Sequence, residues 1–319
     1  MLVPSFLLFF VLYVISFLLV LTCNDWFMLW MGLEINMVCY IMLIYKRYDL
    51  WNLESCYKYF FIQSISSACF LSLLFINMYN MNYLIMMMLM LKMGAGPFYF
   101  WFPSVMKGIN WLSGFMLMSF QKFIPLMLSS MFINSIFWKI GMLSMFIGMF
   151  GSFNQLNIKE LLAYSSIYHL GWLLICMMID NSFWMVYLFM YSLLLLSIVI
   201  ILIDEEIINM MMINKLKGKW WFFMSILSMG GMPPFLGFFL KVLTLYYILQ
   251  VDVFYVVLLL MMSVVMFYVY FRLLYNLIMG YNTEMMWLNM NFYKIYYKKD
   301  IYTLIGMFLM LLISMMLLF

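Results

Sequence analysis

Long apolar blocks separated by short polar or charged clusters dominate the pattern of this chain. A helix of about 20 apolar residues spans a bilayer, so each block predicts a transmembrane helix. Dividing the chain at the polar clusters gives eleven predicted helices, at residues 2–22, 25–45, 56–78, 81–102, 110–132, 134–151, 159–178, 182–203, 220–249, 253–275 and 301–319. The sequence therefore predicts an all-α polytopic membrane protein without a soluble domain, because the longest connection covers only about 276–300.

Composition supports this class and indicates what kind of gene encodes the chain. Of the 319 residues, 69% are apolar and 9% charged, whereas soluble domains carry about 25% charged residues. There are 41 methionines, but alanine occurs only at Ala68, Ala95 and Ala163. This bias indicates an AT-rich gene and a genetic code that spells methionine more often, as in animal mitochondria. Since no lysine or arginine precedes Lys46, we expect the first apolar segment to be a retained helix and not a targeting peptide.

The basic residues predict how the helices are oriented. Twelve of the 16 lie on even-numbered loops or on the helix ends that face them, and these are Lys46, Arg47, Lys58, Lys107, Lys159, Lys215, Lys217, Lys219, Arg272, Lys294, Lys298 and Lys299. Only Lys139 lies on the opposite side. The positive-inside rule then places the N-terminus on the basic side. We therefore expect a multi-pass protein of the mitochondrial inner membrane, with its N-terminus in the matrix and its C-terminus in the intermembrane space.

Two glycine- and proline-rich interruptions divide the chain into similar halves. They are Met93-Gly94-Ala95-Gly96-Pro97-Phe98 and Met229-Gly230-Gly231-Met232-Pro233-Pro234-Phe235. Backbone that unwinds in mid-membrane is tolerated only against protein or a watery cavity. Because the interruptions lie an odd number of helices apart, we predict two inverted five-helix repeats within a single membrane domain, residues 1–132 and 133–280, followed by a matrix-side loop and a final helix at 281–319. Two proline-kinked packing helices are the alternative explanation.

Four ionisable side chains fall inside the predicted helices, and these are Glu34, Lys92, Lys122 and Lys241. A charge at the bilayer centre costs about 2.5–3.5 kcal/mol, so such residues persist mainly where function requires them. Burial penalises the charged form of a lysine, and a nearby carboxylate favours it. Making and breaking a Glu34–Lys92 pair would therefore switch this lysine between holding and donating a proton. We predict that the four residues form a proton relay.

His169, the only histidine, is a further candidate for the relay, because imidazole titrates near neutral pH. A hydrogen-bonded structural role is the alternative. The neighbouring Tyr164, Ser165 and Ser166 could order water beside it or bond adjacent helices. The five cysteines show no CxxC spacing, so we expect neither a metal nor an iron–sulfur site. We also expect no phosphate-binding loop, Ser/His/Asp nucleophile or nucleic-acid-binding face.

Several segments together resemble the family of antiporter-like membrane subunits of respiratory complex I. The segments are Trp30–Asn36, Leu91–Phe98, Phe120–Lys122, Asn154-Gln155 with Ser165–Trp172, and Gly230–Lys241. The resemblance covers essentially the whole chain and implies the eleven-helix animal form, which is shorter at its N-terminus than the fourteen-helix bacterial relatives. It also implies that Glu34, Lys92, Lys122 and Lys241 occupy the proton-path positions of the family.

The resemblance further implies partners and cofactors. Other complex I subunits are expected as partners, with NADH dehydrogenase subunits 4 and 4L as membrane-arm neighbours, together with membrane lipids such as cardiolipin. NADH, FMN, iron–sulfur clusters and ubiquinone are expected in other subunits and no cofactor in this chain. Tyr99 and Ser104 depart from the family pattern, in which His and an acid or amide are usual, so the matrix-side inlet residues are not carried over.

These observations favour a proton-translocating subunit of an NADH:ubiquinone oxidoreductase in which other subunits transfer the electrons. A free-standing cation/proton antiporter is the alternative, although such exchangers usually bury more carboxylates than Glu34 alone. A structural membrane spacer is a third hypothesis, and it predicts that neutralising the four buried charges changes nothing.

Overall fold

The computed structural model describes residues 4–76, 81–132, 134–179, 182–205, 209–210, 213, 218–233, 235–249 and 253–281. Nearly all of these residues are helical. The only β feature within these ranges is an isolated bridge between Asn157 and Asn209. Six helices of the described chain are long and apolar enough to cross a membrane, and four shorter apolar helices accompany them. The predicted all-α polytopic membrane class is confirmed.

The helices follow the predicted order closely. They are α1 (Pro4–Thr22), α2 (Trp26–Ile44), α3 (Leu50–Ile76), α4 (Met81–Met93), α5 (Trp101–Gly108), α6 (Trp111–Met118), α7 (Phe120–Ser129), the 3-10 helix η1 (Ser130–Phe132), α8 (Ile136–Ser152), α9 (Ile158–Ile179), α10 (Phe183–Glu205), α11 (Lys219–Gly230), α12 (Leu236–Leu249) and α13 (Val253–Tyr281). The final predicted helix 301–319, the loop before it and Pro234 lie outside the described residues, so the count of eleven stays a prediction.

Several helix boundaries differ from the sequence prediction, and one of them is the end of α13, which lies at Tyr281 and not at 275. Helix α3 begins at Leu50 and not at 56, because Asp49 provides the first acceptor carbonyl and polar Asn52 accepts the Lys46 N–H at its start. The predicted helix 110–132 is interrupted at Ser119, whose backbone angles (φ −114, ψ −76) separate α6 from α7. After the first interruption, α5 continues to Gly108, beyond the predicted end at 102.

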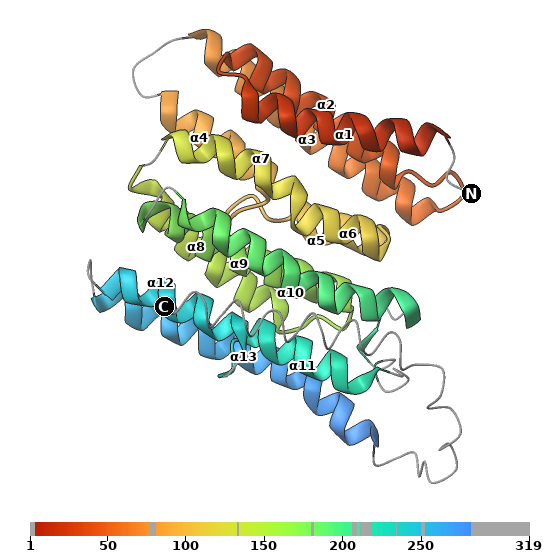
Figure 1. The fold of residues 1–319 in the computed structure, drawn as a ribbon, viewed down its shortest axis with the longest axis vertical. Coiled ribbons are helices and arrows are strands. Elements are labelled where there is room, and N and C mark those ends of the chain that lie inside the picture. The colour runs from red at the N-terminus through yellow and green to blue at the C-terminus, as the bar shows by residue number, and fades with distance from the viewer. Residues whose placement is uncertain are drawn as a thin grey trace. The chain divides into compact units, whose positions relative to one another are not determined.

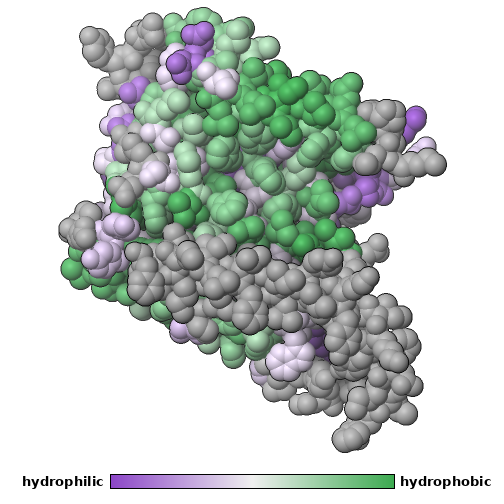
Figure 2. Space-filling view, in the orientation of Figure 1, coloured by the Kyte–Doolittle hydropathy of each residue, from purple (hydrophilic) through white to green (hydrophobic). Residues whose placement is uncertain are grey.

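The chain divides into two compact units, residues 1–148 with 159–181, and residues 149–158 with 182–319. In the first unit α1 packs on α2, α2 on α3, and α3 on both α4 and α5 (Figure 1). Its core contains Leu29, Leu33, Phe70 and Leu89. Apolar side chains cover the exposed face of α1 and α2, and hydrophilic residues gather near the helix ends (Figure 2). This distribution suits helices that face lipid or other membrane segments.

In the second unit, α11 and α12 follow each other across the second interruption. Helix α13 packs along both, and α10 contacts both as well (Figure 1). The two units do not coincide with residues 1–132 and 133–280, since the first unit also takes α9 and most of α8. The predicted inverted repeats remain a prediction.

Within the first unit, glycines let α8 and α9 approach closely. A Cβ on Gly148 would lie 2.6 Å from the Tyr168 nitrogen, and one on Gly171 would lie 2.6 Å from the Gly141 oxygen. Small residues permit such close helix packing in membranes. Helix α9 is consequently the most enclosed candidate span, with 83% of its most apolar window buried.

Candidate functional site

The two interruptions end their helices in the same way. Gly94 after α4 and Gly231 after α11 adopt the left-handed conformation, with φ of 69° and 80°. The next N–H in each case reaches back five residues, from Ala95 to the Met90 carbonyl and from Met232 to the Leu227 carbonyl, at 3.0 and 3.2 Å. This pattern is the Schellman motif, in which glycine avoids the Cβ strain of a positive φ. Both helices therefore stop in the middle of an apolar segment.

The same correspondence extends beyond the glycines. The Phe98 N–H donates to Ala95 at 2.7 Å, and the Phe235 N–H donates to Met232 at 2.8 Å, so the two turns share their next hydrogen bond. Lys92 lies just before the first break, in the last turn of α4, whereas Lys241 lies after the second break on α12. The breaks are alike, but the lysines occupy opposite sides of them.

Lys241 is bound to the end of the helix that precedes its own. Its side chain is 7% exposed, and its Nζ donates to the Gly230 carbonyl at 2.7 Å. Gly230 is the last residue of α11, where the carbonyl groups carry the negative end of the helix dipole. The short α11–α12 break thus brings an ammonium group to a helix C-terminus.

Lys122 is the most deeply buried of the three lysines, at 2% exposure. It lies in the first turn of α7, and its Nζ donates to the Ser166 carbonyl of α9 at 2.7 Å. The ammonium also lies 5.0 Å from the centre of the Phe102 ring, within the range of a cation–π interaction. An ammonium group at this position links α7 to α9 inside the first unit.

Lys92 is 6% exposed and lines a small internal cavity. The half-buried Glu34 of α2 lies close enough to Lys92 for an electrostatic interaction. The two are not within the 4.0 Å of a salt bridge, since the ion pairs found in the described part of the chain involve other residues. The predicted approach of Glu34 to Lys92 is therefore observed as a neighbourhood and not as a direct pair.

His169 lies in the enclosed α9 and is 4% exposed. Its ring packs edge-on against Tyr168, with 5.4 Å between the ring centres. The hydroxyls of Ser165 and Ser166 donate to carbonyls of their own helix, at Leu162 and Ala163. These hydroxyl protons are thus used within α9, and the role of His169 in a relay stays a prediction.

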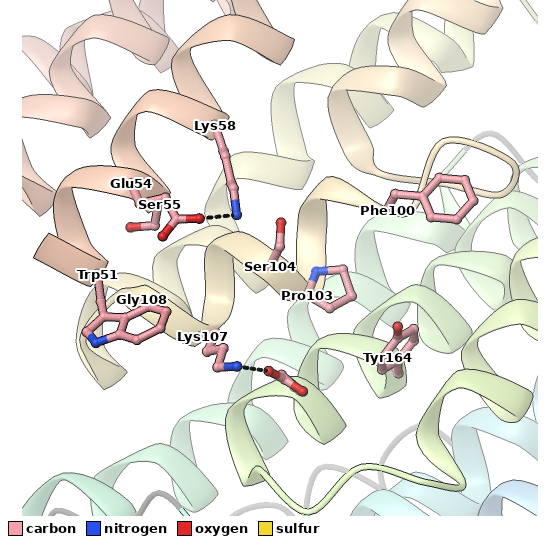
Figure 3. Close-up of a pocket in the computed structure, with 11 residues that line it drawn as sticks. Trp51, Glu54, Ser55, Lys58, Phe100, Pro103, Ser104, Lys107, Gly108 and Tyr164 are labelled. Carbon is pink, nitrogen blue, oxygen red and sulfur yellow. Dashed lines mark ion pairs between the residues drawn. The ribbon is translucent and has the colours of Figure 1, made fainter.

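A larger cavity of about 410 Å³ opens where α3 begins, α5 ends and α9 begins, and we call it the terminal cavity. Figure 3 shows its lining, which includes Trp51, Lys58, Ser104, Lys107 and Tyr164. Two ion pairs lie at its wall. Lys58 pairs with Glu54 of the same helix at 2.6 Å, and Lys107 of α5 pairs with Glu160 of α9 at 3.5 Å (Figure 3). The terminal cavity is therefore lined by charged residues and lies at one end of the first unit.

The first turn of α9 also closes the end of α5. Lys159 donates to the Ile109 carbonyl at 2.6 Å and lies 5.5 Å from the centre of the Trp111 ring. From α3, Asn52 reaches the Gly108 carbonyl at 3.5 Å. The half-helix that follows the first break is consequently fixed at its far end by two neighbouring helices.

Uncharged polar residues around Lys92 were not among the predicted site residues. Asn36, Gln63 and Gln121 are carboxamides in otherwise apolar helices, and they line the small cavity beside Lys92 together with Tyr59. Their presence in apolar segments was a signal, because a buried polar group requires a hydrogen-bond partner. Within the described residues, no group of three or more His, Cys, Asp or Glu side chains is placed to hold a metal ion.

Comparison with known proteins defines the class and then the family of this chain. Residues 23–83 and 73–267 match the membrane family described as NADH:quinone oxidoreductase/Mrp antiporter. The chain is 37% identical over 302 residues to NADH-ubiquinone oxidoreductase chain 2 of Anopheles gambiae, and 35% identical over 304 residues to that of Aedes aegypti, with 89% of both chains covered in each comparison. The chain belongs to the NADH-ubiquinone oxidoreductase chain 2 family.

Solved structures share the fold. A chain of respiratory complex I from Thermus thermophilus with bound aureothin matches with a TM-score of 0.76 and 23% identity, over 85% of this chain and 70% of that chain. A chain of the membrane-bound sulfane sulfur reductase, an archaeal respiratory membrane complex, matches with a TM-score of 0.78 and 17% identity, over 96% of this chain and 72% of that chain. A chain of the Mrp complex from Dietzia sp. DQ12-45-1b matches with a TM-score of 0.68 and 14% identity, over 86% of this chain and 59% of that chain.

Proposed function

We propose that this chain is a proton-translocating subunit of NADH:ubiquinone oxidoreductase (respiratory complex I) in the mitochondrial inner membrane. The observation that carries the proposal is the burial of three lysines, Lys92, Lys122 and Lys241, at 2–7% exposure in apolar helices. Their ammonium groups are costly in such surroundings, and membership of the family supplies the process that would require them. Glu34 and His169 complete the proposed relay.

The same proposal assigns the redox chemistry to the rest of the assembly. NADH, FMN, the iron–sulfur clusters and ubiquinone would bind other subunits, and subunits 4 and 4L would flank this chain in the membrane arm, with lipids such as cardiolipin around it. The N-terminus would face the matrix and the C-terminus the intermembrane space, as the distribution of basic residues predicts.

The terminal cavity supports an inlet on the basic side. It adjoins α5, the half-helix that follows the first break, and its charged lining can hold water. Protons that arrive there would reach the interior beside the break, where Lys92 and Lys122 lie. In this scheme Lys92 and Lys122 serve the first unit and Lys241 serves the second.

The direct test replaces Lys122 by methionine in the assembled complex. Methionine has a similar length, and removing the charge also removes the cost of keeping an ammonium group in an apolar interior. We expect normal assembly on native gels and a fall of at least about tenfold in the proton translocation that this chain contributes, which corresponds to only ~1.4 kcal/mol.

The matched control is Lys139→Met, which removes an exposed lysine of α8 and should leave proton translocation unchanged. The proposal is wrong if the Lys122→Met complex assembles and translocates protons at the wild-type ratio to electrons.

A free-standing cation/proton antiporter is the second candidate, because the matched family also includes Mrp antiporters by its description. Gentle solubilisation of the native membrane separates the two. Recovery of the chain in one large assembly with NADH oxidation activity supports the first proposal, and recovery as a stable lone protein that exchanges cations for protons supports the second.

A further inference from the structure

The three buried lysines differ in how their ammonium groups are bonded. Lys122 and Lys241 each donate to a backbone carbonyl at 2.7 Å. In the part of the chain that the structure describes, the Lys92 Nζ has no protein acceptor within hydrogen-bond distance, although the side chain is only 6% exposed. An ammonium carries three donors, and a buried polar group without a partner is costly. Lys92 therefore needs a partner other than the described residues.

The small cavity beside Lys92 is suited to supply one. Its volume is about 20 Å³, and Asn36, Tyr59, Gln63 and Gln121 line it together with Lys92. A polar cavity needs roughly 10–15 Å³ to hold one water molecule, which also requires two to four polar partners. The cavity meets both requirements for a water molecule.

Two of the lining amides each donate one hydrogen bond to a neighbouring group. The Asn36 Nδ2 donates to the Ser16 hydroxyl at 3.1 Å, and the Gln63 Nε2 donates to the Lys92 carbonyl at 3.0 Å. These bonds fix both amides and leave their carbonyl oxygens as acceptors. A water molecule that accepts a hydrogen bond from an ammonium group needs such acceptors for its own two O–H donors.

Gln121 is held from both ends of its amide. The Tyr59 hydroxyl donates to its Oε1 at 3.2 Å, and its Nε2 donates to the Tyr13 hydroxyl at 3.3 Å. Pro125, four residues further along α7, has no N–H, so the Gln121 carbonyl lacks its usual helical donor. The two tyrosine hydroxyls hold the side chain of Gln121 at the wall of the cavity, one residue before Lys122.

We infer that this cavity binds a single water molecule that accepts a hydrogen bond from the Lys92 ammonium, and that Gln121, held by Tyr13 and Tyr59, is the positioning residue for that water. The inference rests on the proposed function and deepens it, because the water gives Lys92 a hydrogen-bond partner next to α7. Gln121 itself carries no proton in this scheme.

The test compares Gln121→Met and Tyr59→Phe with Tyr40→Phe in the intact complex. Tyr40 is a matched control, because its ring lies 5.1 Å from that of Tyr59 and its hydroxyl is bonded to the Ser113 carbonyl at 2.8 Å, outside the Gln121 network. The first measurement is the ratio of protons translocated to electrons transferred. The second is the infrared difference band of a bound water, identified by its shift in H₂¹⁸O.

We expect Gln121→Met to lower this chain's contribution to proton translocation about tenfold, an effect of the size of one lost hydrogen bond to a charged group. The ratio of protons to electrons for the whole complex falls accordingly. Tyr59→Phe should lower it by a smaller factor, and both variants should lose the band that shifts in H₂¹⁸O. Tyr40→Phe should keep both the ratio and the band. A density map of the complex should show one water within hydrogen-bond distance of the Lys92 Nζ.

The outcomes separate this inference from the proposed function. If Gln121→Met behaves like Tyr40→Phe, or if no water contacts Lys92 in the map, the inference is wrong even where Lys122→Met abolishes translocation. If Tyr40→Phe fails to the same extent as Gln121→Met, the network is only a packing element, and the inference is again wrong. Normal translocation by Lys122→Met overturns the proposed function instead.

Discussion

Replacing Gly171 by alanine tests whether the close contact of α8 with α9 supports the site. The new Cβ would lie 2.3 Å from the Met145 Cγ, 2.6 Å from the Gly141 oxygen and 2.7 Å from the Ser144 Oγ. The Gly141 oxygen belongs to the backbone, so a change of side-chain rotamer cannot relieve that contact. Helix α9 must shift away from α8 to accept the methyl group.

The cost of overpacking in Gly171→Ala is partly offset by the higher helix propensity of alanine. Overpacking of a well-packed interior costs typically ~1–3 kcal/mol, whereas alanine favours a helix over glycine by roughly 0.5–1 kcal/mol. A net destabilisation of about 1–2 kcal/mol follows. The functional effect should be larger than this figure suggests, because Ser166 on the same helix accepts the Lys122 hydrogen bond at 2.7 Å. A shift of α9 lengthens that bond.

Two measurements on the assembled complex check this prediction, the thermal midpoint of its dissociation and the ratio of protons translocated to electrons transferred. We expect both to fall for Gly171→Ala. The control is Gly114→Ala on α6, where the new Cβ would meet the flexible end of Met106 at 2.9 Å and stability should be unchanged or higher. If Gly171→Ala matches this control in both measurements, the packing argument for α9 is refuted.

Two further substitutions address the second unit. Gly231→Ala places a Cβ 2.9 Å from the Lys241 Nζ at a φ of 80°. We expect stability to fall by about 1–2 kcal/mol because alanine disfavours the left-handed conformation, and proton translocation to fall because the ammonium is displaced from Gly230. Wild-type translocation would contradict this prediction. Arg272→Met removes the hydrogen bond from the Arg272 guanidinium on α13 to the Phe153 carbonyl just after α8. This variant should lower the thermal midpoint more than Arg272→Lys does, because lysine keeps the charge. Equal midpoints for the two variants would contradict this prediction.

The sequence predicted most of the fold because a bilayer imposes a simple length rule on apolar segments. The ends of α1, α2 and α9 lie within a few residues of their predicted positions. At both predicted glycine-rich interruptions the helix ends, as predicted. The interruption at Ser119 was not predicted, because a single serine is compatible with a helix and only its observed backbone angles reveal the break.

The candidate site was predicted in part. The burial of Lys92, Lys122 and Lys241 followed from their position in apolar blocks, and the structure shows it. Their individual partners could not be predicted, because the Ser166 carbonyl that binds Lys122 lies 44 residues away along the chain. The bonds of Gln121 likewise join three separate helices, and periodicity along one helix contains no information about such contacts.

The central claim is that the buried ammonium groups move protons, and one measurement tests it most directly. The ratio of protons translocated to electrons transferred should be determined in proteoliposomes that contain the complex with Lys92, Lys122 and Lys241 all replaced by methionine. We expect the complex to assemble and the replaced chain to contribute no proton translocation, so the ratio should fall below that of the wild type. An assembled triple variant with the wild-type ratio would contradict the account and leave the chain with the role of a structural spacer.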